Sequence, residues 1–152
     1  MRLLVQRVRR AAVEIGGEEF SHIGQGLLVF VGIEAADGDE DIEWLVKKLL
    51  GLRIFDDEQG VMNLDVRQVE GEVLVVSQFT LHASTKKGNR PSYIRSAPEA
   101  VSRPMYERFV ARVEAELGRR VPTGEFGADM QVDILNDGPV TIILDSDEIV
   151  KK

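Results

Sequence analysis

The residues best suited to chemistry follow an apolar run in the middle of the chain. Residues 74–76 are Leu-Val-Val, and the polar side chains that come next are Ser77, Gln78 and Thr80. An unbroken apolar run predicts a strand that is covered on both faces and presents its polar groups at the far end. Rigid scaffolds hold functional groups at such places. We therefore predict a site here that is built from hydroxyl, amide and backbone groups.

A second segment near the end of the chain has a similar character. Residues 136–141, Asn-Asp-Gly-Pro-Val-Thr, are turn-prone and lie between two strand-like runs at 130–135 and 140–144. The Gly-Pro pair fits an ordinary turn, and only about one X–Pro bond in twenty is cis in folded proteins. We predict that this segment and residues 77–80 together form one site.

Several common catalytic sites are excluded by composition. The chain has no cysteine, and its two histidines, His22 and His82, have no metal-ligand spacing. It also lacks a Gly-rich phosphate loop, so we expect no metal and no cofactor. A Ser-His-Asp triad can be assembled from Ser77 and His82, but the many Ser and Asp residues give that match no specificity. Thr80 is either a nucleophile or an ordinary β-branched strand residue, and its type alone favours the second.

Charge and hydropathy limit the partners. The net charge of −7 over 152 residues argues against broad, non-specific binding to nucleic acid. Basic residues nevertheless gather after the central run, and this group is either a solvated surface or a local phosphate site: Lys86, Lys87, Arg90 and Arg95. No run is long enough to span a membrane, and the start is too weakly apolar for a signal peptide, so we expect a soluble, cytoplasmic protein.

The elements that position these residues form an α+β fold. We predict strands at 2–15, 18–23, 27–33 and 53–55, a hairpin of 66–69 with 73–79, and the two strands around residues 136–141. One helix is predicted over residues 39–51, and a second opens at a capping box on Ser96 or, because of Pro104, near Ser102. These elements predict one domain over 1–152: two packed, mostly antiparallel β-sheets, barrel-like, with two helices on one outer face and a loose tail at 145–152.

Three motifs identify a resemblance to a known family. Residues 77–81 (Ser-Gln-Phe-Thr-Leu), 89–93 (Asn-Arg-Pro-Ser-Tyr) and 136–141 closely resemble the signature segments of the D-aminoacyl-tRNA deacylases, long called D-tyrosyl-tRNA deacylases. The resemblance continues through residues 6–8, 51–55, 62–64 and 129–132. The chain departs from the family at Tyr93, where phenylalanine is usual, and in its acidic tail.

The resemblance implies a substrate and an assembly. Family members hydrolyse the ester that joins a D-amino acid, or glycine as mischarged on tRNA-Ala, to the 3′ adenosine of tRNA, and they spare L-aminoacyl-tRNA. They are homodimers in which a cis Gly-Pro pair enters the site of the opposite subunit. By this resemblance, Gly138 and Pro139 face residues 77–80 of the partner, accept the α-ammonium on backbone carbonyls and exclude an L side chain. The other residues expected to bind substrate are Ser77, Gln78, Asn136 and Thr141.

The chemistry implied by the resemblance needs few side chains. We expect the backbone N–H groups of Phe79 and Thr80 to stabilise the oxyanion, with help from the tRNA 2′-hydroxyl, while Lys86, Lys87 and Arg90 bind phosphates. An alternative makes the Thr80 hydroxyl the nucleophile. Two alternative functions also stay open: a related editing deacylase of relaxed chirality, and a non-catalytic module that binds D-amino acids or RNA ends.

Overall fold

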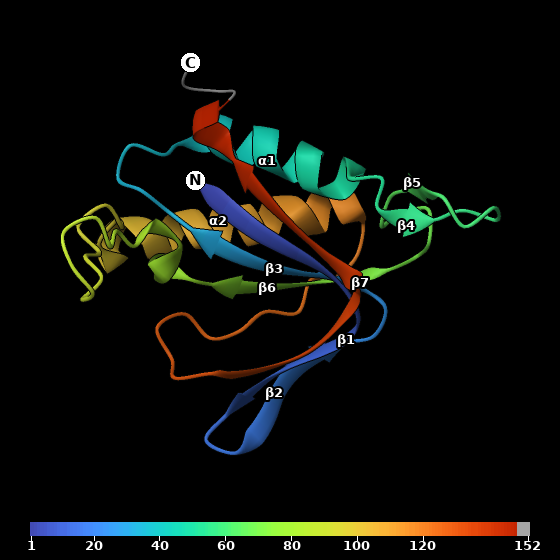
Figure 1. Cartoon of the computed structure of the whole chain (residues 1–152), viewed down its shortest axis with the longest axis horizontal. Coiled ribbons are helices and arrows are strands. Elements are labelled where there is room, and N and C mark those ends of the chain that lie inside the picture. The colour runs from blue at the N-terminus through green and yellow to red at the C-terminus, as the bar shows by residue number, and fades with distance from the viewer. Residues whose placement is uncertain (149–152) are drawn as a thin grey trace.

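A long first strand organises the sheet. The computed structural model describes residues 1–148, and in it β1 (Arg2–Ile15) has three antiparallel partners. These are β3 (Gly26–Gly32) along its first half, β2 (Glu18–Ile23) along its second half, and β7 (Gln131–Asp145) along nearly all of it. β6 (Glu72–Ser77) pairs in parallel with β3. Together they form a five-stranded, mostly antiparallel sheet that curls into a half barrel (Figure 1).

Both helices lie against one face of this sheet (Figure 1). α1 (Asp39–Gly51) has apolar residues three and four positions apart, so one stripe is buried: Ile42, Leu45, Val46, Leu49 and Leu50. α2 (Glu99–Leu117) buries Met105, Tyr106, Phe109 and Val113 in the same core. The Tyr106 hydroxyl donates a hydrogen bond to the Val75 carbonyl of β6 (3.1 Å), and burial raises the pKa of Tyr106 to about 12. The predicted α+β class is confirmed.

The face of the sheet opposite the helices has a smaller core of its own. Met130 and Val132 pack against this core. Its buried apolar side chains come from β1, β2, β3 and β6: Val8, Ala11, Val13, Ile23, Leu28, Leu74 and Val76. β6 is therefore covered on both faces, as its unbroken apolar run predicted. A separate two-stranded sheet of β4 (Phe55–Asp56) and β5 (Met62–Leu64) completes the strands of the described residues.

The hairpin predicted from residues 66–69 and 73–79 is wrong. Residues 65–70 form consecutive turns, because the Asp65 side chain accepts hydrogen bonds from the backbone N–H groups of Arg67 (2.9 Å) and Gln68 (3.0 Å). The chain then enters β6 beside β3 and leaves it at Ser77. A short 3₁₀ helix, η1 (Phe79–His82), follows where the prediction had continued the strand.

The start of α2 also differs from the prediction. α2 begins at Glu99 after Pro98, and Pro104 is accommodated inside the helix. Ser96 caps nothing, because its hydroxyl donates a hydrogen bond to the Phe79 carbonyl (2.8 Å). Ser96 therefore fixes η1 instead of opening a helix.

The turn predicted at residues 136–141 is a bulge within one strand. β7 runs continuously from Gln131 to Asp145, but its register with β1 shifts. Gln6 pairs with Thr141 and Val8 pairs with Asn136, so residues 137–140 all stand opposite Arg7. Residues 137–140 have no partner in β1 and project out of the sheet, so they lie at the surface.

The predicted loose tail starts too early. Asp145 belongs to β7, and residues Ser146–Glu148 form the short 3₁₀ helix η2. The buried Ser146 hydroxyl donates a hydrogen bond to Asp41 at the start of α1 (2.6 Å), so this part of the chain is held against the helix. Residues 149–152 of the predicted tail lie outside the described residues.

Candidate active site

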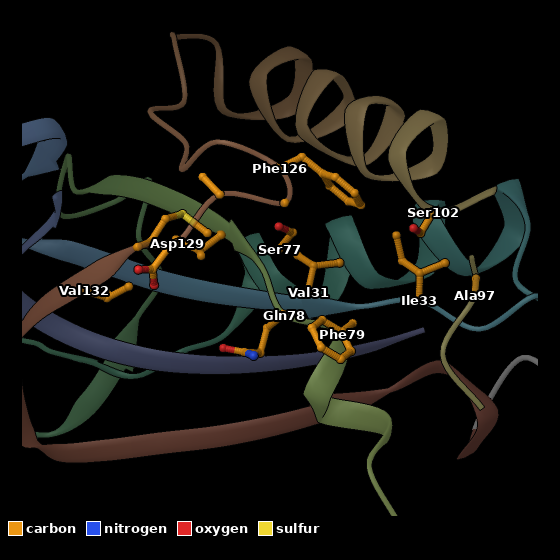
Figure 2. Close-up of a pocket in the computed structure, with 14 residues that line it drawn as sticks. Val31, Ile33, Ser77, Gln78, Phe79, Ala97, Ser102, Phe126, Asp129 and Val132 are labelled. Carbon is orange, nitrogen blue, oxygen red and sulfur yellow. The ribbon is translucent and has the colours of Figure 1, made fainter. Parts of the chain in front are cut away.

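A pocket of about 310 Å³ lies where β3 and β6 end (Figure 2). Its floor is apolar and includes Val31 and Val76, and Phe126 contributes to its wall. The polar side chains that line it are Ser77, Gln78, Ser102 and Asp129. Such a hollow, mostly apolar with a few polar groups, is typical of a small-molecule site. The predicted site at the end of the central strand thus coincides with a pocket.

At the end of β6 the backbone loses its hydrogen-bond partners in β3. The Gln78 N–H donates to the Val31 carbonyl (2.8 Å) and is the last contact of this strand with β3. Within residues 1–148, the N–H groups of Phe79 and Thr80 donate no hydrogen bond. They are the first N–H groups of η1, and the first turn of a helix leaves such donors without partners. The described chain therefore presents two adjacent backbone donors beside the pocket.

A glycine allows η1 to lie this close to the sheet. A Cβ added to Gly32 would lie 2.9 Å from the Leu81 Cβ and 3.2 Å from the Gln78 carbonyl oxygen. The first distance is shorter than real Cβ contacts and the second is tighter than most of them, so another residue at this position in β3 would require η1 to shift. The Arg2 guanidinium also donates to the Leu81 carbonyl (2.7 Å), which fixes η1 from the side of β1.

The two side chains of the expected catalytic pair differ in position. The Phe79 ring lines the pocket, is 58% exposed and packs edge-on against Tyr93 with ring centroids 5.0 Å apart. The Thr80 side chain is not part of the pocket lining, and its hydroxyl accepts a hydrogen bond from the Gln78 side-chain amide. A backbone role for both residues fits this arrangement better than a Thr80 nucleophile does.

A buried histidine lies behind η1. His82 is 1% exposed, and its Nδ1 lies 3.6 Å from the Glu34 carboxylate, which also pairs with Arg95 (2.6 Å). Neither His82 nitrogen has a hydrogen-bond partner in the described chain, whereas the Arg95 pair joins Glu34 to the loop that precedes α2. His82 is not among the residues that line the pocket, and it forms no hydrogen bond with Ser77 in the described chain, so the Ser77–His82 triad is not assembled.

The bulge of β7 is held by two polar residues. The Asn136 side-chain amide donates to the carbonyls of Arg7 (2.9 Å) and Val140 (3.1 Å). The buried Arg7 guanidinium donates to the Asp137 carbonyl (3.2 Å) and to the Ile54 carbonyl (2.6 Å). Arg7 is a residue that the sequence analysis missed, because it occurs among other arginines in β1.

The tip of the bulge is exposed and shaped by glycine. Gly138 has φ of +121°, the Gly138–Pro139 peptide bond is cis, and both residues are exposed. A Cβ at Gly138 would lie 2.8 Å from the Val140 side chain and 3.0 Å from the Arg7 guanidinium. The backbone at this position is thus reserved for glycine. Thr141 accepts a hydrogen bond from Gln6 (3.2 Å), so like Asn136 it braces the bulge.

The two predicted segments do not meet within one chain. Gly138 and Pro139 are absent from the lining of the pocket. Arg2 holds η1, whereas Arg7 holds the bulge, and five residues of β1 correspond to about 17 Å. A single chain therefore brings together Ser77, Gln78 and Phe79 but leaves the bulge apart from them.

The basic residues lie in the loop between η1 and α2. Lys86, Lys87 and Arg90 are exposed, and a pair of backbone hydrogen bonds between Ser84 and Ser92 (2.8 Å each) closes the loop. Within the described chain none of the three basic side chains forms an ion pair, so all three charges are available to a ligand.

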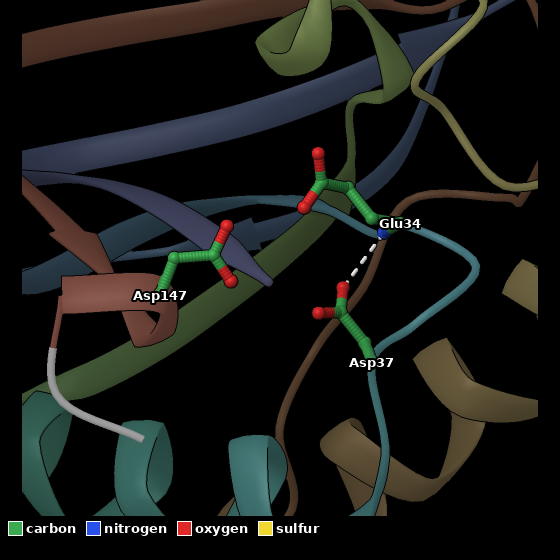
Figure 3. Close-up of side chains that lie close together, drawn as sticks. All are labelled: Glu34, Asp37 and Asp147. Carbon is green, nitrogen blue, oxygen red and sulfur yellow. Dashed lines mark hydrogen bonds between the residues drawn. The ribbon is translucent and has the colours of Figure 1, made fainter. Parts of the chain in front are cut away.

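Three carboxylates gather near the start of β1 and outside the pocket lining. Glu34, Asp37 and Asp147 each place one oxygen within 4.8 Å of the others (Figure 3). Asp37 accepts hydrogen bonds from the Glu34 N–H (2.7 Å) and from the Met1 amino group (2.6 Å). These bonds tie the start of β1 to the loop before α1, which is a structural role.

Among residues 1–148 no helix has the length and apolar character needed to span a membrane.

The sequence analysis also missed a whole wall of the pocket. Residues 126–130 and Val132 form one side of it, and Ala97 and Ser102 at the start of α2 form another. Residues 126–130 have neither helical nor strand periodicity, so only their place in the family resemblance, which includes residues 129–132, signalled their importance.

Comparison with known proteins identifies the family of this chain. A family model described as D-Tyr-tRNA(Tyr) deacylase matches residues 4–145. Proteins named D-aminoacyl-tRNA deacylase from Bacteroides thetaiotaomicron and Chromobacterium violaceum are 60% and 61% identical over 146 residues, which cover 96% of this chain and 97% of each relative.

Two solved structures are similar to this chain over nearly its whole length. A structure described as c-Myc DNA unwinding element binding protein has a TM-score of 0.89 and 42% identity, covering 96% of this chain and 99% of that one. A probable eukaryotic D-amino acid tRNA deacylase shares the fold, with a TM-score of 0.82 at 19% identity, covering 94% of this chain and 97% of that one. From its match over residues 4–145 and its identity to these relatives, the chain belongs to the D-Tyr-tRNA(Tyr) deacylase family.

Proposed function

We propose that this protein is a hydrolase that cleaves the ester of D-aminoacyl-tRNA, and of glycyl-tRNA mischarged on tRNA-Ala, and spares L-aminoacyl-tRNA. The observation that carries the proposal is the pocket at the end of β6 with two backbone N–H groups beside it that have no partner in the described chain. Donors fixed in place before reaction stabilise the negative charge that develops on an ester carbonyl. The family to which the chain belongs supplies the substrate class.

The chemistry proposed for the site uses backbone donors and the substrate itself. An aminoacyl ester is already activated, so hydrolysis requires mainly orientation and oxyanion stabilisation. The N–H groups of Phe79 and Thr80 act as the oxyanion donors, and Ser77 and Gln78 bind the aminoacyl end. The 2′-hydroxyl of the terminal ribose assists the attack of water. No metal or cofactor takes part in this scheme, and the enzyme acts in the cytoplasm.

Selection against L-aminoacyl groups is proposed to come from a second subunit. In a two-fold homodimer, Gly138 and Pro139 of one chain enter the pocket of the other, where backbone carbonyls accept the α-ammonium and leave no space for an L side chain. The position of the bulge supports this, since it is exposed and too far along β1 to serve its own pocket.

The surface around the bulge supports the same assembly. β7 pairs only with β1 among the described strands, so its other edge is open. That strand also exposes Ile134 (36%), Leu135 (44%) and Ile143 (63%). An open edge strand with apolar side chains is a surface that proteins cover with a partner.

Purified protein tests the proposed function directly. The two substrates are tRNA charged with D-tyrosine and tRNA charged with L-tyrosine. We expect kcat/KM for the D form to exceed that for the L form at least about 100-fold, because the backbone of Gly138 and Pro139 leaves no space for an L side chain. Released tyrosine is the readout. Equal rates for the two forms, or no release from either, would contradict the proposal.

Mixing two inactive variants tests the contribution of the second subunit. Gly138→Ala damages the bulge, and Ser102→Trp fills the pocket, so each homodimer should be inactive. Co-expressed, they should regain about one quarter of the wild-type rate, because about half of the dimers are mixed and each mixed dimer has one intact site.

A site completed within one chain gives no such recovery, because no chain in the mixture then has both parts. Light scattering on each variant provides the control that all samples are dimeric. Wild-type protein that is monomeric under the assay conditions while fully active would also rule out the shared site.

Thr80→Ala separates the backbone role from the nucleophile. We expect single-turnover deacylation of D-tyrosyl-tRNA within about tenfold of wild type, since the N–H group remains and only the hydroxyl contact with Gln78 is lost. Thr80→Ser keeps the hydroxyl and serves as the matched control. Loss of a nucleophile typically costs many orders of magnitude, so a fall of more than about 1000-fold in the alanine variant with intact tRNA binding would identify Thr80 as the nucleophile.

The basic loop is proposed to bind phosphates of the acceptor end. Replacing Lys86 and Lys87 by alanine should weaken tRNA binding and lower the slope of log affinity against log salt by about one to two. Lys47→Ala with Lys48→Ala is the matched control, because both are exposed on α1 and outside the pocket. An unchanged affinity and salt slope in the loop variant would remove the loop, including Arg90, from the tRNA-binding surface.

A further inference from the structure

The pocket has a single formal charge among its lining residues in the described chain. Fourteen residues line it, and Asp129 is the only one that is acidic or basic. Asp129 is exposed, and within residues 1–148 its side chain has no hydrogen bond or ion pair. A carboxylate without a partner at the rim of an otherwise neutral pocket is available to a cationic ligand.

This charge lies at one end of the pocket. Figure 2 places Asp129 and Val132 at the end opposite Ala97 and Ser102, with Ser77 and Phe79 between them. The Ala97 end adjoins the first turn of α2, where the helix dipole is positive. The loop that carries Lys86, Lys87 and Arg90 leads into the same end. The first turn of α2 also carries Glu99, but Glu99 is paired with Arg103 (2.6 Å). The pocket is therefore negative at Asp129, and the helix dipole and the basic loop lie toward its other end.

An aminoacyl-tRNA end has the same polarity. Its phosphates are negative, and the one positive group near the ester is the α-ammonium of the amino acid. The phosphates are repelled by Asp129 and attracted by the basic loop, which orients the nucleotide toward α2 and the aminoacyl group toward Asp129. The reacting ester then lies near Phe79, between the two ends.

We propose that Asp129 is a specificity-determining residue that attracts the α-ammonium and so selects esters whose amino group is free and charged. The inference rests on the function proposed above and deepens it. Gly138 and Pro139 provide a steric test and neutral acceptors, whereas Asp129 adds a full charge. Because the ammonium is equally charged in the ground state and the transition state, the attraction lowers KM and leaves kcat nearly unchanged.

Three variants and two substrates test this inference. Asp129→Asn removes the charge, Asp129→Glu keeps it, and Glu107→Gln is the control: Glu107 is an exposed acidic residue of α2 that does not line the pocket. The substrates are D-tyrosyl-tRNA and its α-hydroxy analogue, in which a neutral hydroxyl group replaces the ammonium. Steady-state kinetics at low and high salt, with thermal unfolding to check folding, provide the readouts.

We expect Asp129→Asn to raise KM for D-tyrosyl-tRNA about three- to tenfold, because an exposed charge is partly screened, and the effect should shrink at high salt. Asp129→Glu should keep most of the wild-type KM, the control should not change it, and KM for the hydroxy analogue should not respond to Asp129→Asn. A wild-type KM in Asp129→Asn, or equal losses on both substrates, overturns the inference. Failure of wild-type protein to release D-tyrosine would instead refute the proposed function itself.

Discussion

The site depends on the point where backbone pairing stops. β6 pairs in parallel with β3 as far as Ser77, and the Gln78 N–H makes the last bond to Val31. Beyond it the chain turns into η1, whose first two N–H groups donate no hydrogen bond in the described chain. Two buried strands hold this junction rigidly, so the donors at Phe79 and Thr80 are fixed without any side chain being assigned to them. The absence of cysteine and the displaced position of His82 are consistent with chemistry of that kind.

Other parts of the structure serve this junction. Gly32 provides the space for η1, Arg2 and Ser96 hold its carbonyls, and α2 supports β6 through Tyr106. Each of these contacts joins η1 or β6 to a different element. A change in one of them would therefore alter the direction of the two N–H groups rather than remove a group, and such small displacements would be costly for the proposed stabilisation of an oxyanion.

The parts of the fold predictable from sequence are those with a single dominant pattern. β3 and β6 are unbroken apolar runs, and α1 has a clean stripe of buried residues, so all three could be located, although β6 ends at Ser77 and not at residue 79 as predicted. Residues 65–70 could not, because the capping bonds of Asp65 outweigh the strand preference of two valines. The bulge at Gly138 was read as a turn, since the register of β7 against Arg7 is a property of two strands that no local pattern contains. The wall at residues 126–130 has no periodicity, and its place in the pocket depends on a long connection between α2 and β7.

An incomplete edge explains why one chain gives only part of the proposed site. β7 offers hydrogen-bonding groups and apolar side chains along its open side, and the bulge projects from the same strand. A partner that covers this edge removes apolar surface from water and places the bulge in a pocket by the same contact, so stability and selectivity have one cause. The need for Gly138 then arises twice. Its φ of +121° and the nearby Val140 and Arg7 exclude a side chain within the chain itself, and a proposed substrate would exclude one from the other side. Both the fold of the chain and the proposed substrate therefore require glycine at position 138.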